Sequence, residues 1–573
     1  MSSIQLSCSA ASFTGQKGRK LFAPIHIEAS GGAGFPQGAQ CFVRVWFVSS
    51  SKAVLSIQAI PGLWNAVVSS TGAIGVESFN PFNPIGTTTD FTAFATFFDP
   101  NSPTAPDSYT AAYQVEITDA SPQRNVIDSK PVQLSGSASA VQPVSVIFAL
   151  DHGNSMGTPD SPGVTRLDRL KTALPLGIAL LRGEDSLGAV AFGNVNCAPD
   201  VPIPLDLAST AQKDRANAFA LALTVDQSNP PQKPIQVGIE RARAMSQTAT
   251  LVLVTDGENN NTPGHRLVKP TLPTSALVIT SDVPPQPNYN ILVSTNGEYA
   301  FASAPLGSFA IEKLLAQILV GIGGGSVISD PEGSLEPGGK LSFPLRVTEA
   351  DRELAVIVCS DDADAINVHV DGLQVPNQHP EADCHTGEHH HREQPEVIRS
   401  KRFVITRLSA PPLTDKELPF EPKVVISRAP TASGCGALVR FNLIATAKSD
   451  LKFDAQVTRT GTTVGSELLF SAVLSEYGLA LQSSKAEVRV QLSHPDGFSQ
   501  TLELQSVPGA AGRFQASLRS FRTGFYTAHF IATGQSLLQE RAFRRELVRT
   551  IAVGEASECC QTEAPALCTF IKT

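Results

Sequence analysis

Residues 143–156 read PVSVIFALDHGNSM, and this stretch decides the fold of the domain around it. An apolar run that begins at Val144 and ends at Leu150 leads directly into Asp151, which the residues HGNS follow. Such a run is typical of a strand that is buried on both faces in the middle of a parallel sheet. Because open α/β sheets bind ligands at the carboxyl ends of their strands, we expect Asp151 at a binding edge.

A second apolar run of the same kind follows about a hundred residues later. Residues 249–254 read ATLVLV, and Thr255, Asp256 and Gly257 come directly after them. Two buried strands that each end in an aspartate bring two carboxylates to one edge of a sheet. Hard oxygen ligands of this type suit Mg²⁺ or Ca²⁺. The pair of strands therefore predicts a divalent-cation site.

Four motifs stand in a fixed order between about residues 144 and 325. They are DHGNS at Asp151–Ser155, RLDRLKTAL from Arg166, GEDSLGAVAF at Gly183–Phe192 and LVTDGENN at Leu253–Asn260. This order resembles a von Willebrand factor type A (vWA) domain. The resemblance implies a doubly wound, Rossmann-like α/β fold that binds a protein partner through the top of its sheet.

The resemblance also implies a set of metal ligands. The family's metal-ion-dependent adhesion site uses an Asp, two Ser, a Thr and a second Asp, of which Asp151, Ser155 and Asp256 match three. Gly153 replaces the first Ser, and residues 233–235 (KPI) stand where the Thr is expected. We expect a weakened site for Mg²⁺, Mn²⁺ or Ca²⁺. Two alternatives stay open: the aspartates only cap strands in a metal-free domain, or the lysine of KPI supplants the cation.

Periodic apolar positions predict the helices of this domain. Residues 167–181 carry one apolar stripe at three- and four-residue steps, and Pro175 should kink that helix. Further helices are expected at 211–223, 237–245 and 309–320. Strands that alternate with helices in this way give a parallel-rich sheet with both faces covered.

The chain is too long for one core, so we expect a multidomain protein. Outside the vWA-like segment the apolar period is two, which favours about three all-β sandwich domains. Residues 135–143 (SGSASAVQP) read as a linker, and GFYTAHFIATG from Gly524 resembles bacterial Ig-like repeats. The predicted organisation is a tail (1–20), a β-sandwich (21–140), the vWA domain (143–325), a β-sandwich (326–457) with a His-rich loop (379–396), an Ig-like β-sandwich (458–555) and a Cys-containing tail (556–573).

Composition and charge narrow the class of partner. A net charge of −9, with no strongly basic stretch, argues against nucleic acid. We see neither a signal peptide nor an apolar run long enough to cross a membrane, so a cytoplasmic location is the default and an extracellular one the alternative. Cys41 and Cys359 lie in strand patterns and read as buried thiols.

The sequence EADCHTGEHHHRE, residues 381–393, is a second candidate metal site. Its histidines and Cys384 could bind Zn²⁺, although a solvated polar connector is the favoured interpretation. The sequence has no GxSxG, GxxxxGK[ST] or HExxH motif, so we expect no enzyme. The predicted function is protein binding of an adhesion type through the vWA top face. The alternatives are a structural or surface-array protein and, less favoured, a zinc hydrolase.

Overall fold

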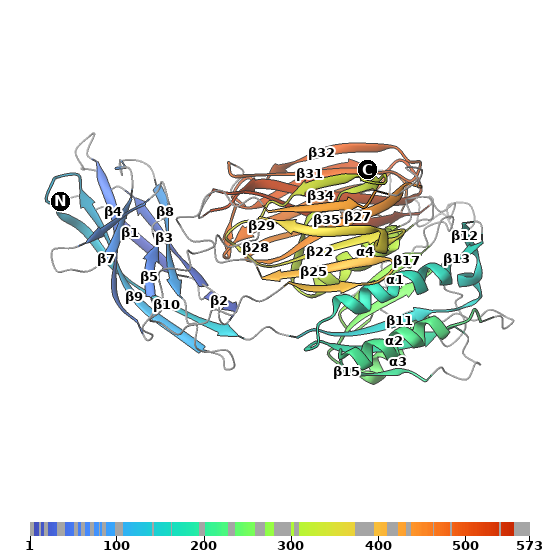
Figure 1. Ribbon diagram of the computed structural model, residues 1–573. Coiled ribbons are helices and arrows are strands. Elements are labelled where there is room, and N and C mark those ends of the chain that lie inside the picture. The colour runs from blue at the N-terminus through green and yellow to red at the C-terminus, as the bar shows by residue number, and fades with distance from the viewer. Residues whose placement is uncertain are drawn as a thin grey trace, which may run out of the picture.

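The computed structural model shows a largely β protein with one α/β domain (Figure 1). The structure describes residues 5–10, 13–16, 21–30, 40–50, 55–58, 64–68, 74–78, 81–82, 88–97, 107–139, 143–161, 163–193, 201–226, 235–257, 270–279, 299–302, 309–372, 395–409, 422–430, 437–461, 463–481, 484–537 and 540–554. Among these residues, no helix combines the length and apolar character that crossing a bilayer requires.

The N-terminal region contains two antiparallel-rich sheets that share one core. The first sheet has the order β1-β3-β8-β5 and the second β2-β10-β9-β4-β7-β6. The strands are β1 (Gln5–Ala10), β2 (Phe13–Gln16), β3 (Leu21–Ser30), β4 (Cys41–Ser50), β5 (Leu55–Gln58), β6 (Trp64–Val68), β7 (Ile74–Ser78), β8 (Thr88–Phe97), β9 (Asp107–Asp119) and β10 (Val126–Ser139). Tyr113, Val115 and Ile117 of β9 are fully buried, as expected for a strand with an apolar period of two.

Two sequence-based boundaries of this region differ from the structure. The expected tail 1–20 includes β1, which pairs with β3, and β2, which pairs with β10. The first part of the expected linker, residues 135–139, is the end of β10. Small polar residues hid this strand end, because their backbone groups pair in the sheet whatever the side chains are.

The α/β domain is built on a six-stranded sheet with the order β15-β14-β11-β16-β17-β18. Its strands are β11 (Ser145–Asp151), β14 (Ser186–Phe192), β15 (Ile203–Leu207), β16 (Thr250–Thr255), β17 (Thr274–Ile279) and β18 (Tyr299–Ala302). β15 runs antiparallel to β14, and the other neighbours run parallel. A short ribbon of β12 (Pro159–Ser161) and β13 (Val164–Thr165) lies between β11 and the first helix.

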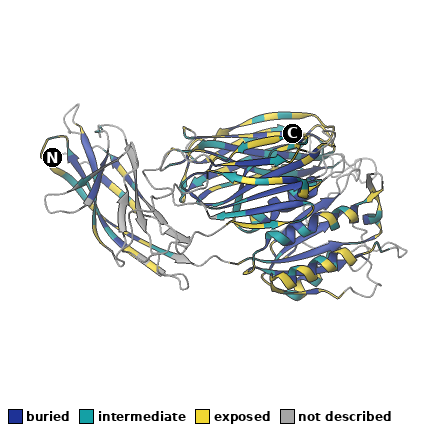
Figure 2. Ribbon diagram, in the orientation of Figure 1, coloured by how far each residue is buried: buried dark blue, intermediate teal, exposed yellow. Residues whose placement is uncertain are grey.

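Among the described residues of this domain, four helices cover the two faces of the sheet. They are α1 (Arg166–Leu180), α2 (Thr210–Ala222), α3 (Ile235–Met245) and α4 (Ala310–Ile322), and α1 continues through Pro175. Val146, Phe148 and Leu150 pack with α1, α2 and α4, whereas Ile147 and Ala149 pack with α3 on the other face. α2 and α3 carry buried residues toward the sheet and exposed residues away from it, whereas α4 is buried or half-buried along nearly all of its length (Figure 2). The doubly wound arrangement is therefore the one that the sequence predicts.

Where the structure describes it, the C-terminal region consists of strands and one short 3-10 turn, Ala363–Ala365. Its strands are β19 (Gly325–Ser329), β20 (Glu332–Leu335), β21 (Lys340–Pro344), β22 (Asp351–Ser360), β23 (Ile366–Asp371), β24 (Glu396–Arg399), β25 (Phe403–Ser409), β26 (Lys423–Arg428), β27 (Val439–Ser449), β28 (Leu451–Arg459), β29 (Glu467–Glu476), β30 (Leu479–Ala480), β31 (Ala486–Ser493), β32 (Ser499–Ser506), β33 (Arg513–Arg519), β34 (Gly524–Gln535) and β35 (Ala542–Val553). β21, β26 and β23 form a separate three-stranded sheet in that order.

One continuous sheet joins the two modules of this region. β19 pairs with β27 of the first module and, through Val327 and Glu546, with β35 of the second. β28 pairs with β29, and its Leu451 and Ala455 belong to the core of the last module. The predicted boundary at 457/458 therefore falls inside β28. An apolar period of two predicts strands in this part of the chain, but it contains no information about which strand pairs with which.

The doubly wound domain is mounted on this C-terminal region. Leu176 of α1 and Ala316 of α4 share a core with Ile357 and Ile405, which lie on β22 and β25. Helices α1 and α4 thus lie between their own sheet and the sheet of the neighbouring module (Figure 1). Val548 of β35 also packs against the α1 and α4 side of the domain core.

Candidate functional site at the carboxyl edge

The two aspartate strands are parallel neighbours in the centre of the sheet. The register of β11 and β16 pairs Val146 with Thr250 and Leu150 with Val254. Asp151 and Asp256 follow shortly after these paired positions, so both stand at the carboxyl edge. The predicted neighbourhood of the two strands is confirmed.

Asp151 is fully buried and holds the loop that follows β11. Its Oδ1 accepts a hydrogen bond from the backbone N–H of Gly153 at 2.9 Å. Its Oδ2 accepts one from the hydroxyl of Thr255 at 2.6 Å, and the Thr255 hydroxyl accepts one from Gly257 N–H at 3.1 Å. Both oxygens of this carboxylate therefore take part in fixing the ends of β11 and β16.

Asp256 is also fully buried, and a guanidinium lies against it. Oδ2 of Asp256 accepts a hydrogen bond from the Ser155 hydroxyl and lies 3.3 Å from Nη1 of Arg166. The same Nη1 donates to the backbone oxygen of Ser155 at 3.4 Å. Only 5% of the Arg166 side chain is exposed. The structure thus brings together all three predicted ligand residues and adds a cationic side chain to them.

Local sequence fixes the place of this arginine. Arg166 is the first residue of α1, and Thr165 and Asp168 form a reciprocal capping box at that helix end. The backbone N–H of Arg166 donates to the Thr158 oxygen at 3.2 Å, and this hydrogen bond ties α1 to the loop after β11. A cation at a helix N-terminus is electrostatically disfavoured by the helix dipole, so the Asp256 carboxylate is needed beside it.

The rest of the edge is linked by His152. Its backbone N–H donates to the Phe192 oxygen at 3.0 Å, and its Nδ1 lies 3.0 Å from the Thr224 oxygen. The N–H of Asp226 donates to the His152 oxygen at 2.9 Å. A Cβ on Gly193 would stand 3.0 Å from the imidazole Nε2, so glycine leaves room for this ring. The described residues that directly follow β11 and α2 are therefore tied to each other and to the end of β14.

Sequence reasoning missed Arg166 and Thr255 as site residues. Both lie inside quoted motifs, but Arg166 meets Asp256 across 90 positions, a separation that no local period encodes. The signal that the sequence offered was the type of residue at the start of the expected helix. A cation there is disfavoured by the helix dipole and, once buried, requires an acidic partner. The lysine of KPI, residue 233, lies outside the described residues.

Other predicted metal-binding residues can be placed only in part. Residues 379–394 of the His-rich loop and the cysteines of the C-terminal tail lie outside the described residues, and Glu396, the last residue of the expected loop, begins β24. Within the part of the chain that the structure describes, no group of three His, Cys, Asp or Glu side chains is placed to hold a metal ion. Cys41 and Cys359 are buried free thiols, as expected, and burial raises the pKa of Cys41 to about 11.

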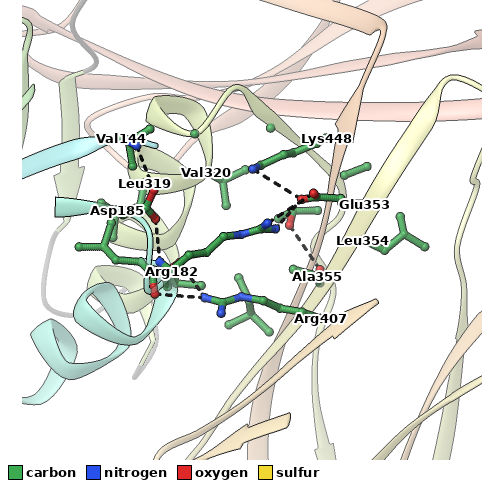
Figure 3. Close-up of a pocket in the computed structure, with 17 residues that line it drawn as sticks. Val144, Arg182, Asp185, Leu319, Val320, Glu353, Leu354, Ala355, Arg407 and Lys448 are labelled. Carbon is green, nitrogen blue, oxygen red and sulfur yellow. Dashed lines mark hydrogen bonds and ion pairs between the residues drawn. The ribbon is translucent and has the colours of Figure 1, made fainter. Parts of the chain in front are cut away.

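A cavity of about 100 Å³ lies at the opposite end of α1, between the doubly wound domain and the C-terminal region (Figure 3). Arg182 forms an ion pair there with Glu353 of β22, and Lys448 lies 3.5 Å from the same carboxylate. Arg407 of β25 donates to the oxygens of Ala179 at 3.0 Å and Leu180 at 2.8 Å. Burial raises the pKa of Glu353, but the hydrogen bond and charge of Arg182 outweigh it and hold that pKa below its usual value.

Comparisons with known proteins give several vWA neighbours of low similarity. A von Willebrand factor type A structure from Catenulispora acidiphila aligns at 12% identity over 66% of this chain and 72% of the other, with a TM-score of 0.26. Manganese-loaded TRAP protein from Plasmodium vivax aligns at 15% identity over 31% and 72%, with a TM-score of 0.21. The ArnB paralog VWA2 from Sulfolobus acidocaldarius aligns at 6% identity over 79% and 74%, with a TM-score of 0.22. No protein-family model and no curated protein matches the sequence. The assignment of this domain to the doubly wound α/β folds therefore rests on its own strand order and on the residues at its carboxyl edge.

Proposed function

We propose that this chain is a non-enzymatic, adhesion-type protein that binds a protein partner through the carboxyl edge of its doubly wound sheet. The observation that carries the proposal is the reversal of strand order at β11. From β11 the chain adds β14 on one side and then β16 on the other. Loops diverge at such a point, and open α/β sheets bind their ligands in the crevice between them.

The hydrogen bonds among the described residues of this edge support recognition by a surface that is already ordered at those residues. His152 ties the residues that directly follow β11 and α2 to the end of β14, and Arg166 and Asp256 tie the start of α1 to the end of β16. An ordered edge loses little conformational entropy when a partner binds. Asn154 is exposed on it, and Val201, at 83% exposure, precedes the strand that runs antiparallel to β14.

The same bonding favours binding over catalysis. Each of the two aspartates accepts hydrogen bonds from groups of the edge itself. A general base needs to reach a proton of the substrate. Carboxylates that hold loops act as positioning groups, and this supports a recognition role for the edge.

A structural or array role is the second candidate, and one observation favours it. The sheet that passes through β27, β19 and β35 makes one continuous unit of the two C-terminal modules. A continuous sheet resists bending between modules, as a spacer should. In this role the two C-terminal modules, the last of which we expect to be Ig-like, would act as a spacer of fixed length. The carboxyl edge would then bind no partner.

Substitutions at opposite ends of one strand test the proposal. Val201 precedes β15, is 83% exposed and lies toward the carboxyl edge of the sheet. Leu207 is the last residue of β15, is 56% exposed and lies toward the amino edge. The full chain, immobilised, is exposed to extract of its source cells beside the variants Val201→Asp and Leu207→Asp, and retained proteins are compared by quantitative mass spectrometry. We expect a partner that Val201→Asp loses at least about tenfold and Leu207→Asp retains, since a buried charge at an interface is costly.

Two results would contradict the proposed edge. Equal retention by both variants would show that the partner binds elsewhere. Recovery of only further copies of this chain, equally by both variants, would favour the array role instead.

A further inference from the structure

With the Arg166 guanidinium in place, the carboxyl edge does not fit the divalent cation that the vWA resemblance implies. Gly153 supplies no side-chain oxygen, and the Asp151 oxygens accept hydrogen bonds from Gly153 N–H and the Thr255 hydroxyl. The remaining carboxylate, Asp256, faces the Arg166 guanidinium. A metal ion needs oxygens that are directed at it, whereas these oxygens are directed at hydrogen-bond donors of the protein.

Arg166 has the properties that a resident cation would have here. A guanidinium stays charged in proteins, and this side chain is only 5% exposed. One nitrogen, Nη1, lies 3.3 Å from the Asp256 carboxylate and 3.4 Å from the Ser155 oxygen. These two partners belong to the strand end and the loop that a metal ion would otherwise join.

We propose that the Arg166 guanidinium is the built-in cation of this edge and takes the place of a divalent metal. It neutralises Asp256, bridges β16 to the loop after β11, and leaves no open coordination position for an anionic partner group. Recognition at the edge then uses hydrogen bonds and apolar contacts and does not depend on metal. The inference concerns the same edge as the proposed function, but it can be tested without any partner.

The test uses Arg166→Met, Asp256→Asn and the double variant, each in the full chain. Methionine retains much of the arginine volume and removes the charge, so Asp256 is left buried without this cation. We follow thermal unfolding by far-ultraviolet circular dichroism, because all four described α-helices belong to this domain. Mn²⁺ binding is followed by calorimetry, with EDTA as the metal-free reference.

We expect wild type to give no Asp256-dependent heat with Mn²⁺ and the same Tm in Mn²⁺ and EDTA. Arg166→Met should lower the Tm by about 5–10 °C, because a buried charge loses its partner. Millimolar Mn²⁺ should restore about 3–5 °C of that loss by binding to the vacated site. The double variant should regain its Tm without metal and ignore Mn²⁺, because the Asp256→Asn substitution removes the charge that needs to be neutralised.

Three results would overturn the proposal. The first is uptake of Mn²⁺ by wild type that Asp256→Asn abolishes, which would show that metal and Arg166 coexist. The second is an Arg166→Met variant that loses no stability. The third is an Arg166→Met variant that loses stability but does not bind Mn²⁺, which would show that Arg166 and Asp256 form an ordinary ion pair and do not replace a metal. Should Arg166→Met not fold, a folded double variant would support the charge pairing, and an unfolded one would contradict it. A failed partner experiment changes none of these outcomes.

Discussion

The two ends of helix α1 both use arginine, but they use it in opposite electrostatic settings. At the N-terminal end, Arg166 stands against the helix dipole and is held by Asp256 within the same domain. At the C-terminal end, Arg407 comes from another module and donates to the oxygens of Ala179 and Leu180, where the dipole favours a cation. Arg166 pairs with a carboxylate of its own domain against the helix dipole. Arg407 pairs with Glu396 at 2.9 Å and is also favoured by the carbonyl end of the helix.

The two ends of α1 therefore have different structural roles: the N-terminal end orders the loops of one edge, and the C-terminal end joins two modules. The Arg166 pair joins loops of one edge and fixes their arrangement. The C-terminal end gathers Arg182, Glu353, Lys448 and Arg407 around a shared cavity and attaches one module to the next (Figure 3). Removal of a partner should therefore cost more at the first end than at the second.

The largest effect is expected for Asp256→Ala. The substitution leaves Arg166 buried, charged and opposed by the dipole of α1, so the free energy of unfolding should fall by about 3–5 kcal/mol. Urea denaturation followed by the helical circular dichroism signal measures it. Addition of Arg166→Met in the same chain should recover most of the loss. A double variant as unstable as Asp256→Ala would show that packing, and not charge, explains the effect.

An intermediate effect is expected for Glu353→Gln at the other end of α1. Glutamine retains the size of the side chain but not the charge that pairs with Arg182 and Lys448, and the cost should be about 1–3 kcal/mol. Limited proteolysis of the junction between the modules, together with urea denaturation, measures it. Glu184→Gln is the matched control: Glu184 lies 3.9 Å from Arg182 and is 50% exposed, so its loss should change little.

The pH dependence of the same pair sharpens the comparison. The folded-state pKa of Glu353 lies below its usual value of 4.5, so the unfolded chain binds the proton more tightly. The contribution of Glu353 to stability is therefore fully present above about pH 4.5 and is lost as the pH falls through the lowered pKa. The difference in unfolding free energy between wild type and Glu353→Gln should shrink across that window. A constant difference would contradict the ion pair.

Local patterns could predict the elements of α1 but not the partners at its ends. The apolar stripe from Leu167 indicated the helix, and the two apolar runs indicated β11 and β16 as neighbours at one edge. Arg166 meets its carboxylate across 90 positions, Arg182 meets Glu353 across 171, and Arg407 reaches Ala179 across 228. Periods of about 2 and 3.6 describe which face a residue occupies, and they contain no information about which distant segment covers that face.

The smallest effect is expected at the capping box that precedes Arg166. The Thr165 hydroxyl accepts a hydrogen bond from Asp168 N–H at 3.1 Å, and the Asp168 carboxylate accepts one from Thr165 N–H at 3.0 Å. Thr165→Ala removes this hydroxyl and with it the bond from Asp168 N–H and the bond that the hydroxyl donates to the Asp168 carboxylate at 2.7 Å. The substitution should cost about 1 kcal/mol, with Thr165→Ser as the control that retains the hydroxyl. If Asp256 alone holds Arg166 in place, the losses from Thr165→Ala and Asp256→Ala should add within about 0.5 kcal/mol. A coupling much larger than that would mean that the cap positions the arginine, and that the start of α1 and the carboxyl edge form one cooperative unit.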